Sequence, residues 1–410
     1  MDATVEALAE QLAGNVSGWE TKVLQRIGAR IKKIGGMSPA DVKALNNAAD
    51  VKRDLDELTR ELAKMTDQSV PEIVDMYKAA LEEAHAVDKP LFDYRGKTFV
   101  PISEDPKATA TIRAFAKASA NTMQNVTNTK MLRTKNAAGR VVGLQRAYTE
   151  VLDQAATAVA SGATDFHSAM RESIRALGGN GISVNYGSGV TRRLDTVVRQ
   201  NLMWGAKQSN QMYQRMIGEE LDCDGIEIDW HANPRPSHEF MQGKQFHDGG
   251  DVEIGGVLYP DSTEAREALE EYNCYHYATP IICGVSVPRY DTEELEQLNE
   301  QNAEEYTIGE TTKTGYEWSQ DMRRLETEVR RQKSIREMAK AAGEPELTQQ
   351  CTTRIAACMT KYDQISAATG LDKDTKRLTI TRPKKGPPRR TPTPVIDKTR
   401  KATSKLRAAT

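Results

Sequence analysis

Apolar side chains that recur at steps of three and four residues dominate the first half of this 410-residue chain. That spacing places them on one face of an α-helix, so each stripe predicts an amphipathic helix. Ser38-Pro39 fits a helix N-cap followed by proline in the first turn. We therefore predict an almost entirely helical region over residues 1–218. Its stripes are Leu55, Leu58, Leu62 and Met65; Leu144, Tyr148, Val151, Leu152, Ala155 and Val159; Phe166, Met170 and Ile174; and Val190, Leu194, Val197, Val198, Leu202 and Ala206.

The pattern changes near residue 219. Apolar residues at 226, 228 and 230 alternate with acidic ones, which is typical of a strand. Two glycines, Gly255-Gly256, lie between short apolar runs and favour a hairpin over residues 252–259. A short helix over 261–272 and a strand over 281–287 would complete a small α+β domain at residues 219–290.

The next two segments differ sharply in character. Residues 291–310 hold eight acidic side chains and no Lys or Arg, so we predict a solvated helix and an acidic linker over 291–316. Two further apolar stripes, separated by Gly343-Glu344-Pro345, predict a helical hairpin over 317–370. Cys351 and Cys358 fall on one stripe, where cysteine packs as a small hydrophobe.

Residues 371–410 read as a basic, proline-rich and disordered tail. The last 30 residues contain ten Lys or Arg and one Asp. Such a segment can neutralise phosphates, dock on an acidic protein surface, or simply aid solubility, and charge alone does not decide among these. The candidate polyanion-binding residues are Lys384, Lys385, Arg389, Arg390, Lys398, Arg400 and Lys401.

Overall composition narrows the class of protein. The 56 basic and 58 acidic residues give a net charge of -2, which excludes a uniformly basic nucleic-acid binder. No apolar run approaches the ~20 residues of a membrane span, so we expect no membrane association. The first residues do not resemble a secretory signal, and five cysteines suggest no disulfide framework. We expect synthesis in a reducing cytoplasm.

Histidine and cysteine gather in the small domain. Four of the six histidines, His231, His238, His247 and His276, lie within 46 residues, and Cys274 is close by. Imidazole and thiolate both suit zinc, but the chain has no CxxC or HExxH spacing. We therefore expect no metal and no cofactor, with His238, Cys274 and His276 as the weak metal candidates.

Enzyme signatures are also missing from the sequence. The chain lacks both the GxSxG nucleophile motif and the GxxxxGK[ST] phosphate loop. The sequence analysis therefore favours a protein that is not an enzyme. The alternative is a metal-dependent hydrolase or toxin-like enzyme that uses His231, His238, His247 and Cys274.

One stretch resembles a known family: His231-Ala-Asn-Pro-Arg-Pro-Ser-His-Glu-Phe-Met-Gln-Gly-Lys-Gln-Phe246. It is similar to the phage minor capsid protein 2 family, and its RPSH…QG pattern is the most distinctive part. Asn125-Val-Thr-Asn-Thr129, the Tyr186-Gly-Ser-Gly189 stretch leading into Arg199, and Asn273-Cys-Tyr-His276 agree with the same family, as does the 317–368 hairpin followed by Thr369-Gly370-Leu371. The resemblance spans roughly residues 20–380. One departure is Met241, where the family pattern leads us to expect an aromatic residue.

The resemblance implies a structural virion protein. Members are encoded beside portal and major capsid genes of tailed phages and look related to the Mu F type of head morphogenesis protein, which associates with the portal at few copies. We therefore expect a portal-proximal minor capsid protein of a bacteriophage or prophage, made in the bacterial host cytoplasm and located in the virion head.

The expected partners are the portal protein, other capsid proteins and, through the tail, packaged DNA. A DNA-binding packaging or ejection protein that acts through the tail is a second alternative. The motif residues that we expect to serve docking or local structure are His231, Arg235, Pro236, Ser237, His238, Gln242 and Gly243.

Overall fold

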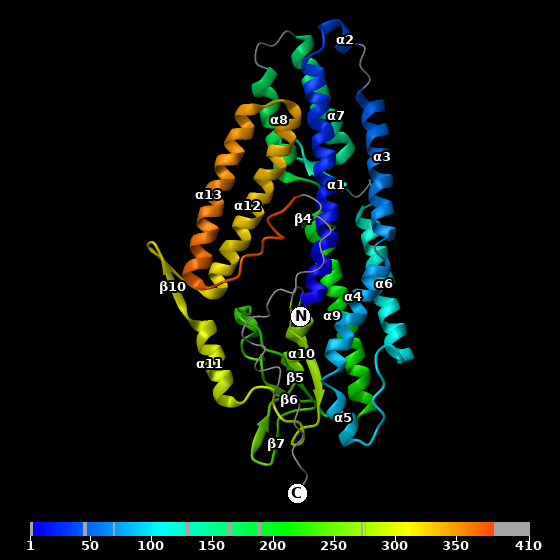
Figure 1. The fold of residues 1–410 in the computed structure, drawn as a ribbon, viewed down its shortest axis with the longest axis vertical. Helices are drawn as coiled ribbons and strands as arrows, with labels where there is room; N and C mark the ends of the chain where they lie inside the picture. Colours follow the sequence, from blue (N-terminus) through cyan, green and yellow to red (C-terminus); the bar gives the residue numbers. More distant parts are fainter. Residues whose placement is uncertain are drawn as a thin grey trace.

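The computed structural model describes residues 3–43, 47–68, 70–127, 132–161, 166–186, 190–271, 274 and 276–380. It is an elongated, mainly helical body with a small α+β region at one end (Figure 1). The expected fold class is thereby confirmed. Among the described helices, none has the length and apolar surface needed to cross a bilayer.

Helix α1 (Ala3–Gly35) runs through the middle of the body (Figure 1). It contacts helices on several sides, among them α4, α7, α9 and α12. A helix surrounded in this way needs apolar residues around most of its circumference. Its buried apolar residues are Ala9, Leu12, Ala13, Val16, Trp19, Val23, Leu24, Ile27, Ile31 and Ile34.

The other helices of the N-terminal region pack around α1 and along one another. Their bounds are α2 (Pro39–Lys43), α3 (Asn47–Gln68), α4 (Val70–His85), α5 (Lys89–Tyr94), α6 (Pro106–Thr127), α7 (Leu144–Ala160), α8 (Phe166–Asn180) and α9 (Leu194–Glu220). The stripes predicted for α3, α7 and α8 face this core. The predicted cap is also present, since Ser38 Oγ accepts from the Asp41 amide 3.3 Å away.

A four-stranded antiparallel sheet interrupts the region that the sequence predicts to be almost entirely helical. Its strands are β1 (Leu132–Lys135), β2 (Val141–Gly143), β3 (Ser183–Asn185) and β4 (Thr191–Arg193), in the order β2-β1-β3-β4. Strands of three or four residues are too short to show a period. Helix α9 accordingly begins at Leu194, and Val190, placed on its stripe by the sequence, lies before β4 and is 46% exposed.

The small α+β region contains a three-stranded antiparallel sheet, β6-β5-β9, and a two-stranded hairpin. The hairpin turns at Gly255-Gly256, as predicted. The strand predicted over 281–287 is wrong, because the chain turns after Ile281 and Gly284 has a φ of 76°. The elements are β5 (Gly225–Ile228), η1 (Pro236–His238), β6 (Gln245–His247), β7 (Val252–Ile254), β8 (Val257–Tyr259), α10 (Thr263–Leu269) and β9 (Ala278–Ile281).

The C-terminal part forms the predicted helical hairpin. Helices α12 (Gly315–Ala342) and α13 (Pro345–Thr369) meet at Gly343, whose φ of 78° ends α12. Cys351 and Cys358 are buried in it, as predicted. The hairpin is not separate from the N-terminal helices, because α12 contacts α1 and α8 and shares their core.

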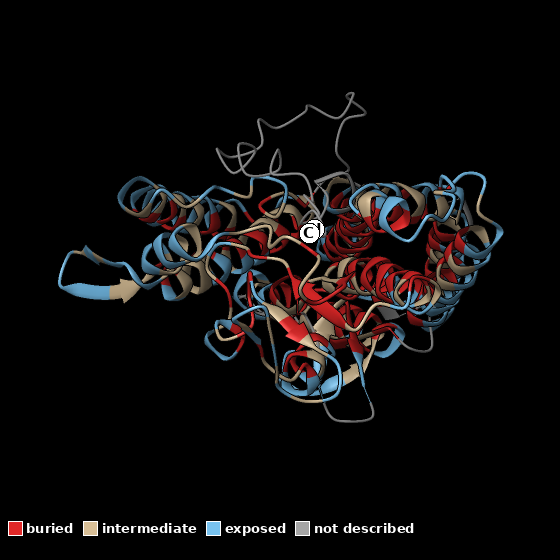
Figure 2. Cartoon of the chain, turned by 90° about the horizontal axis from the view of Figure 1, so that it is seen from below, coloured by how far each residue is buried: buried red, intermediate tan, exposed pale blue. Residues whose placement is uncertain are grey.

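The acidic segment contains more structure than a linker. It forms α11 (Thr292–Ala303), which has no buried residue, and the hairpin β10 (Glu305–Ile308) and β11 (Thr311–Thr314), which projects beside α12 and α13 (Figure 1). Buried residues gather along the interior where the helices meet, and exposed residues cover the outer faces (Figure 2).

The described residues that follow α13 pack against the body. Leu378 and Ile380 are buried, Thr21 Oγ1 donates to the Ile380 carbonyl at 2.8 Å, and Lys333 Nζ donates to the Leu378 carbonyl at 2.7 Å. Placing the start of the tail at residue 371 is therefore wrong, because apolar residues among the charges hold residues 371–380 on α1 and α12. The basic residues predicted for polyanion binding, from Lys384 to Lys401, lie outside the described residues.

Candidate functional site

The RPSH…QG motif forms the long loop between β5 and β6. A single 3-10 turn, Pro236–His238, lies within it, and Asn233 adopts a left-handed conformation with a φ of 53°. Helix α11 holds the loop from one side. The Asn233 amide donates to Asn302 Oδ1 at 2.7 Å, and Trp230 Nε1 donates to Asn299 Oδ1 at 3.3 Å. The motif thus joins the small domain to the acidic helix that follows it.

The predicted docking residues divide into an outer and an inner set. Pro236 and Ser237 are exposed at the tip of the 3-10 turn. Arg235 and His238, on either side of them, both contact the carboxylate of Glu271, which lies 2.5 Å from Arg235 Nη1 and 3.1 Å from His238 Nε2. These two contacts fix the base of the turn.

The inner set fills the domain. Gln242 is fully buried, and its side-chain amide lies 3.3 Å from His276 Nε2. Met241, where the resemblance suggests an aromatic residue, is also fully buried and packs in the small core with Ile226 and Phe246. Gly243 has a φ of 72°, and a Cβ there would lie 2.4 Å from Leu295 Cδ1. The end of the motif therefore needs glycine for its backbone conformation, and a larger residue would also displace the Leu295 side chain.

Three of the metal-candidate residues meet in the interior. His238, Cys274 and His276 are buried, and one ligand atom from each lies within 4.8 Å of the others. Cys274 Sγ is 3.7 Å from His276 Nδ1. His231 stacks on the His276 ring with centroids 4.1 Å apart. We call His238, Cys274 and His276 the His/Cys cluster.

The fourth histidine is used elsewhere. His247 lies in β6, and its Nδ1 is 2.8 Å from the Gly250 carbonyl oxygen. The enzyme alternative requires His247 together with the cluster, and the structure does not bring them together. The local contact instead shapes the loop that leads into β7.

Lys207 of α9 is a cluster neighbour that the sequence analysis missed. Its side chain is 1% exposed, and its Nζ donates to the carbonyls of Leu269 at 2.6 Å and Cys274 at 3.0 Å. An ammonium group is almost never buried without such partners. The only sequence signal is a lysine next to Ala206 on the otherwise apolar face of a long helix.

Burial governs protonation in the cluster. Burial, with a smaller effect of His231 and His238, lowers the pKa of His276 to about 2. Burial also lowers the pKa of His238, although Glu271 opposes it. Burial raises the pKa of the Cys274 thiol, and the Lys207 ammonium opposes that rise. Both imidazoles are therefore neutral at pH 7.

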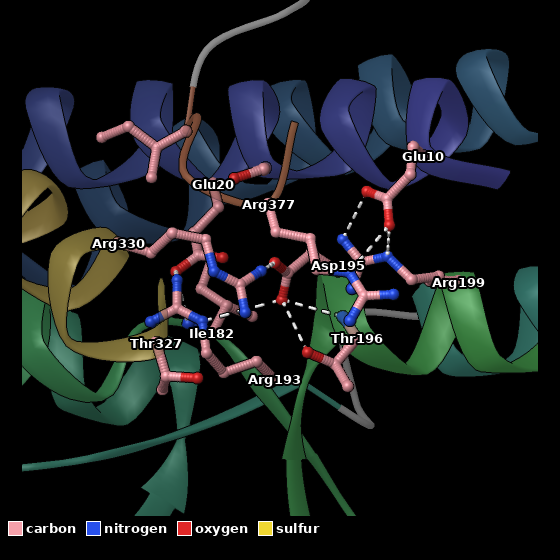
Figure 3. Close-up of polar contacts among 12 residues, drawn as sticks. Glu10, Glu20, Ile182, Arg193, Asp195, Thr196, Arg199, Thr327, Arg330 and Arg377 are labelled. Atoms are coloured by element: carbon pink, nitrogen blue, oxygen red, sulfur yellow. Dashed lines mark hydrogen bonds and ion pairs between the residues drawn. The ribbon is translucent and has the colours of Figure 1, made fainter. Parts of the chain in front are cut away.

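A second polar cluster lies deep among the helices (Figure 3). On its α1 side, Glu20 accepts from the Ile182 amide at 3.1 Å and from Arg193 Nη2 at 2.8 Å. Towards the N-terminus of α1, Arg199 of α9 pairs with Glu10. Arg199 was named only as part of a family stretch, and the pairing of these groups is not visible in the sequence because they lie among apolar stripes.

Asp195 is the centre of this ion network. It pairs with Arg330 of α12, and Arg193 Nε lies 3.6 Å away. Burial opposes the charge of Asp195, but the surrounding guanidinium groups outweigh it and hold the pKa of this carboxyl below its usual value. Arg377, after α13, joins the network through Glu10 at 3.3 Å. The network thus ties α1, α9, α12 and residues 371–380 together.

With this geometry established, comparison with known proteins is informative. A family model described as phage minor capsid protein 2 matches residues 3–364. The chain belongs to this family. Neither the curated proteins nor the solved structures contain a significant match.

Family membership places the protein among the structural components of the phage virion, where other capsid proteins are its partners. The family assignment expected from the RPSH…QG resemblance is confirmed. The matched range includes the motif loop, the His/Cys cluster and most of the ion network, and it ends within α13. The basic tail lies outside it.

Proposed function

We propose that this minor capsid protein acts in head morphogenesis beside the portal and does so without catalysis. The observation that carries the proposal is the family match over residues 3–364, which includes both the helical body and the motif loop. The resemblance to portal-associated head proteins supports a position beside the portal. The structure supplies the candidate contact surface.

The helical body is long and has a continuous core. Helix α1 alone has 33 residues, which corresponds to ~50 Å at 1.5 Å per residue. A continuous core surrounds it and extends into α12 and α13. Buried ion pairs join α1 to α9 and α9 to α12, and they favour one helix register over its alternatives. A stiff body of this kind can hold two partners at a fixed separation.

The 3-10 turn of the motif is the proposed portal contact. Pro236 and Ser237 are exposed, while the bonds of Arg235 and His238 to Glu271 hold the turn in place. A loop that is already ordered loses less conformational entropy on binding, so a small exposed surface can contribute useful affinity.

The surroundings of the His/Cys cluster support a non-catalytic role. A cavity between α9 and the small domain is lined by Arg215, Glu270, Arg266 and Asp248, among others, and does not include the cluster. Within the described residues, the cluster is enclosed by Lys207, Gln242 and core side chains rather than presented to a substrate.

The test is cross-linking in assembled particles. A photo-reactive amino acid at position 237 should cross-link to the portal protein in purified virions. The same group at Glu104, an exposed position just before α6 and outside the motif loop, should not. Portal cross-links from both positions, or from neither, would contradict the proposed contact.

Substitutions in the loop provide an independent test of the same surface. Arg235→Ala removes a contact that holds the turn and should lower incorporation into heads, and His238→Ala should act the same way. Ser237→Ala removes only one hydroxyl from the exposed turn and should lower incorporation less than either of these variants. Arg215→Ala is a matched control, because Arg215 lies outside the motif and pairs with Glu270, the residue before Glu271. If both Arg235→Ala and His238→Ala are incorporated normally, the motif loop is not the portal contact.

A further inference from the structure

We propose that the small domain binds a zinc ion through His238, Cys274 and His276. The sequence alone argued against a metal because these residues show no recognised spacing. The fold nevertheless brings the three side chains together. His238 ends the 3-10 turn of the motif loop, Cys274 and His276 follow α10, and one ligand atom from each lies within 4.8 Å of the others.

The donor set and its dimensions suit zinc. Two imidazoles and a thiolate are typical zinc ligands, with Zn–N near ~2.05 Å and Zn–S near ~2.3 Å. In a tetrahedral site these bonds place nitrogen and sulfur about 3.6 Å apart. Cys274 Sγ and His276 Nδ1 are 3.7 Å apart, which already matches that separation. His238 needs only a small movement to complete the set.

The surrounding groups resemble an outer ligand shell. A metal-bound histidine usually gives its other ring nitrogen to a carboxylate, carbonyl or amide, which fixes the ring. Glu271 lies 3.1 Å from His238 Nε2 and can accept its proton when Nδ1 of His238 binds the metal. The ammonium of Lys207, held on the Cys274 carbonyl, favours the thiolate form of the cysteine that binds metal.

The burial of the cluster, and its absence from the lining of the cavity beside α9, favour a structural ion over a catalytic one. Zinc prefers four ligands, so a water molecule would have to complete the three protein donors. The ion would connect the motif loop to the segment after α10, adding to the contacts of Arg235 and His238 with Glu271 and to side-chain packing. Zinc binding would thereby stabilise the turn that carries Pro236 and Ser237. His238 belongs to both proposals, but zinc uptake by the purified chain is measured without the portal protein, so either proposal can fail alone.

Metal binding by the purified full chain is the direct test, with a tag that contains no histidine. Metal-free protein should take up one zinc ion per chain in competition with a chromophoric chelator. Cobalt(II) in place of zinc should give the absorption of a thiolate ligand and of tetrahedral geometry. Cys274→Ser should lower zinc affinity by at least ~100-fold and remove the thiolate band.

Matched controls come from the same domain. Cys283→Ser changes another buried cysteine, and His247→Asn changes a histidine outside the cluster, so both should bind zinc as the unaltered chain does. Uptake well below one zinc per chain, or zinc affinity unchanged by Cys274→Ser, would overturn the proposal. The cobalt spectrum of the unaltered chain decides the matter even where a variant fails to fold, because absence of the thiolate band excludes Cys274 as a ligand.

Discussion

The buried histidine His276 makes the stability of the small domain depend on pH. Burial holds the pKa of His276 at about 2, against 6.5 for an ordinary histidine. Below pH 6.5 the unfolded chain therefore binds a proton at residue 276, whereas the folded chain does not. The contribution of neutral His276 to the free energy of unfolding is complete above pH 6.5 and is lost as the pH falls towards the folded pKa.

The free energy of unfolding should fall by about 1.4 kcal/mol for each pH unit below 6.5, or by ~2 kcal/mol between pH 7 and pH 5. Denaturant unfolding at both pH values, in the presence of a chelator, measures it. His276→Gln should lose ~2 kcal/mol less than the unaltered chain over this interval. Equal losses in the two proteins would show that His276 does not remain neutral in the folded state.

A second residue-scale prediction concerns the ion network. Arg330→Met leaves the buried Asp195 without its closest partner, and breaking a buried pair typically costs 3–5 kcal/mol, so we expect destabilisation by about 4 kcal/mol. Adding Asp195→Leu should recover most of that loss. Lys22→Met, which breaks an exposed pair with Glu61, should cost less than ~1 kcal/mol. Thermal or denaturant unfolding of the four proteins provides the comparison, and a double variant as unstable as Arg330→Met would contradict the pairing.

At the scale of elements, the segment after α13 acts as a strap. Arg377 reaches Glu10 on α1, Leu378 packs with α12 and α13, and the Ile380 carbonyl accepts from Thr21. A chain ending at Thr381 should therefore keep its full stability. A chain ending at Gly370 should lose about 4 kcal/mol, since burying each large apolar side chain contributes ~2 kcal/mol. Equal unfolding midpoints for the two truncations would exclude the strap.

Sequence periodicity predicted the elements whose length exceeds a few turns. The stripes of α3, α7, α8, α12 and α13 face the core, because a 3.6-residue period needs several repeats to be visible. The strands β1 to β4 are too short for any period and were missed. Residues 371–380 were assigned to the tail because their charges outnumber their apolar residues, although Leu378 and Ile380 are the ones that decide their packing.

In the candidate site, too, some features are visible in the sequence and others only in the fold. The motif residues were identified from the sequence, and Gly243 has the positive φ that explains its presence. What the sequence could not show is which side chains meet across the fold. His238 contacts Glu271, 33 residues away, and Lys207 contacts the Cys274 carbonyl, 67 residues away. Such contacts depend on how α9 and α10 pack, and no local pattern records them.

At the scale of the whole molecule, charge is unevenly distributed. Residues 381–410 contain ten Lys or Arg and one Asp, while the complete chain carries -2. We propose that the tail contacts packaged DNA, since a cationic segment gains affinity for a polyanion by releasing counterions. The full chain should bind duplex DNA with steep salt dependence and no sequence preference, and a chain ending at Thr381 should not bind. Equal binding by both would place the contact elsewhere in the chain.

The central claim is that this minor capsid protein occupies the portal vertex. Quantitative mass spectrometry of purified heads, assembled with and without the portal protein, tests it most directly. The account predicts few copies relative to the major capsid protein in complete heads, and loss of the protein from heads that lack the portal. An unchanged copy number in portal-free heads, or a number that scales with the major capsid protein, would contradict it.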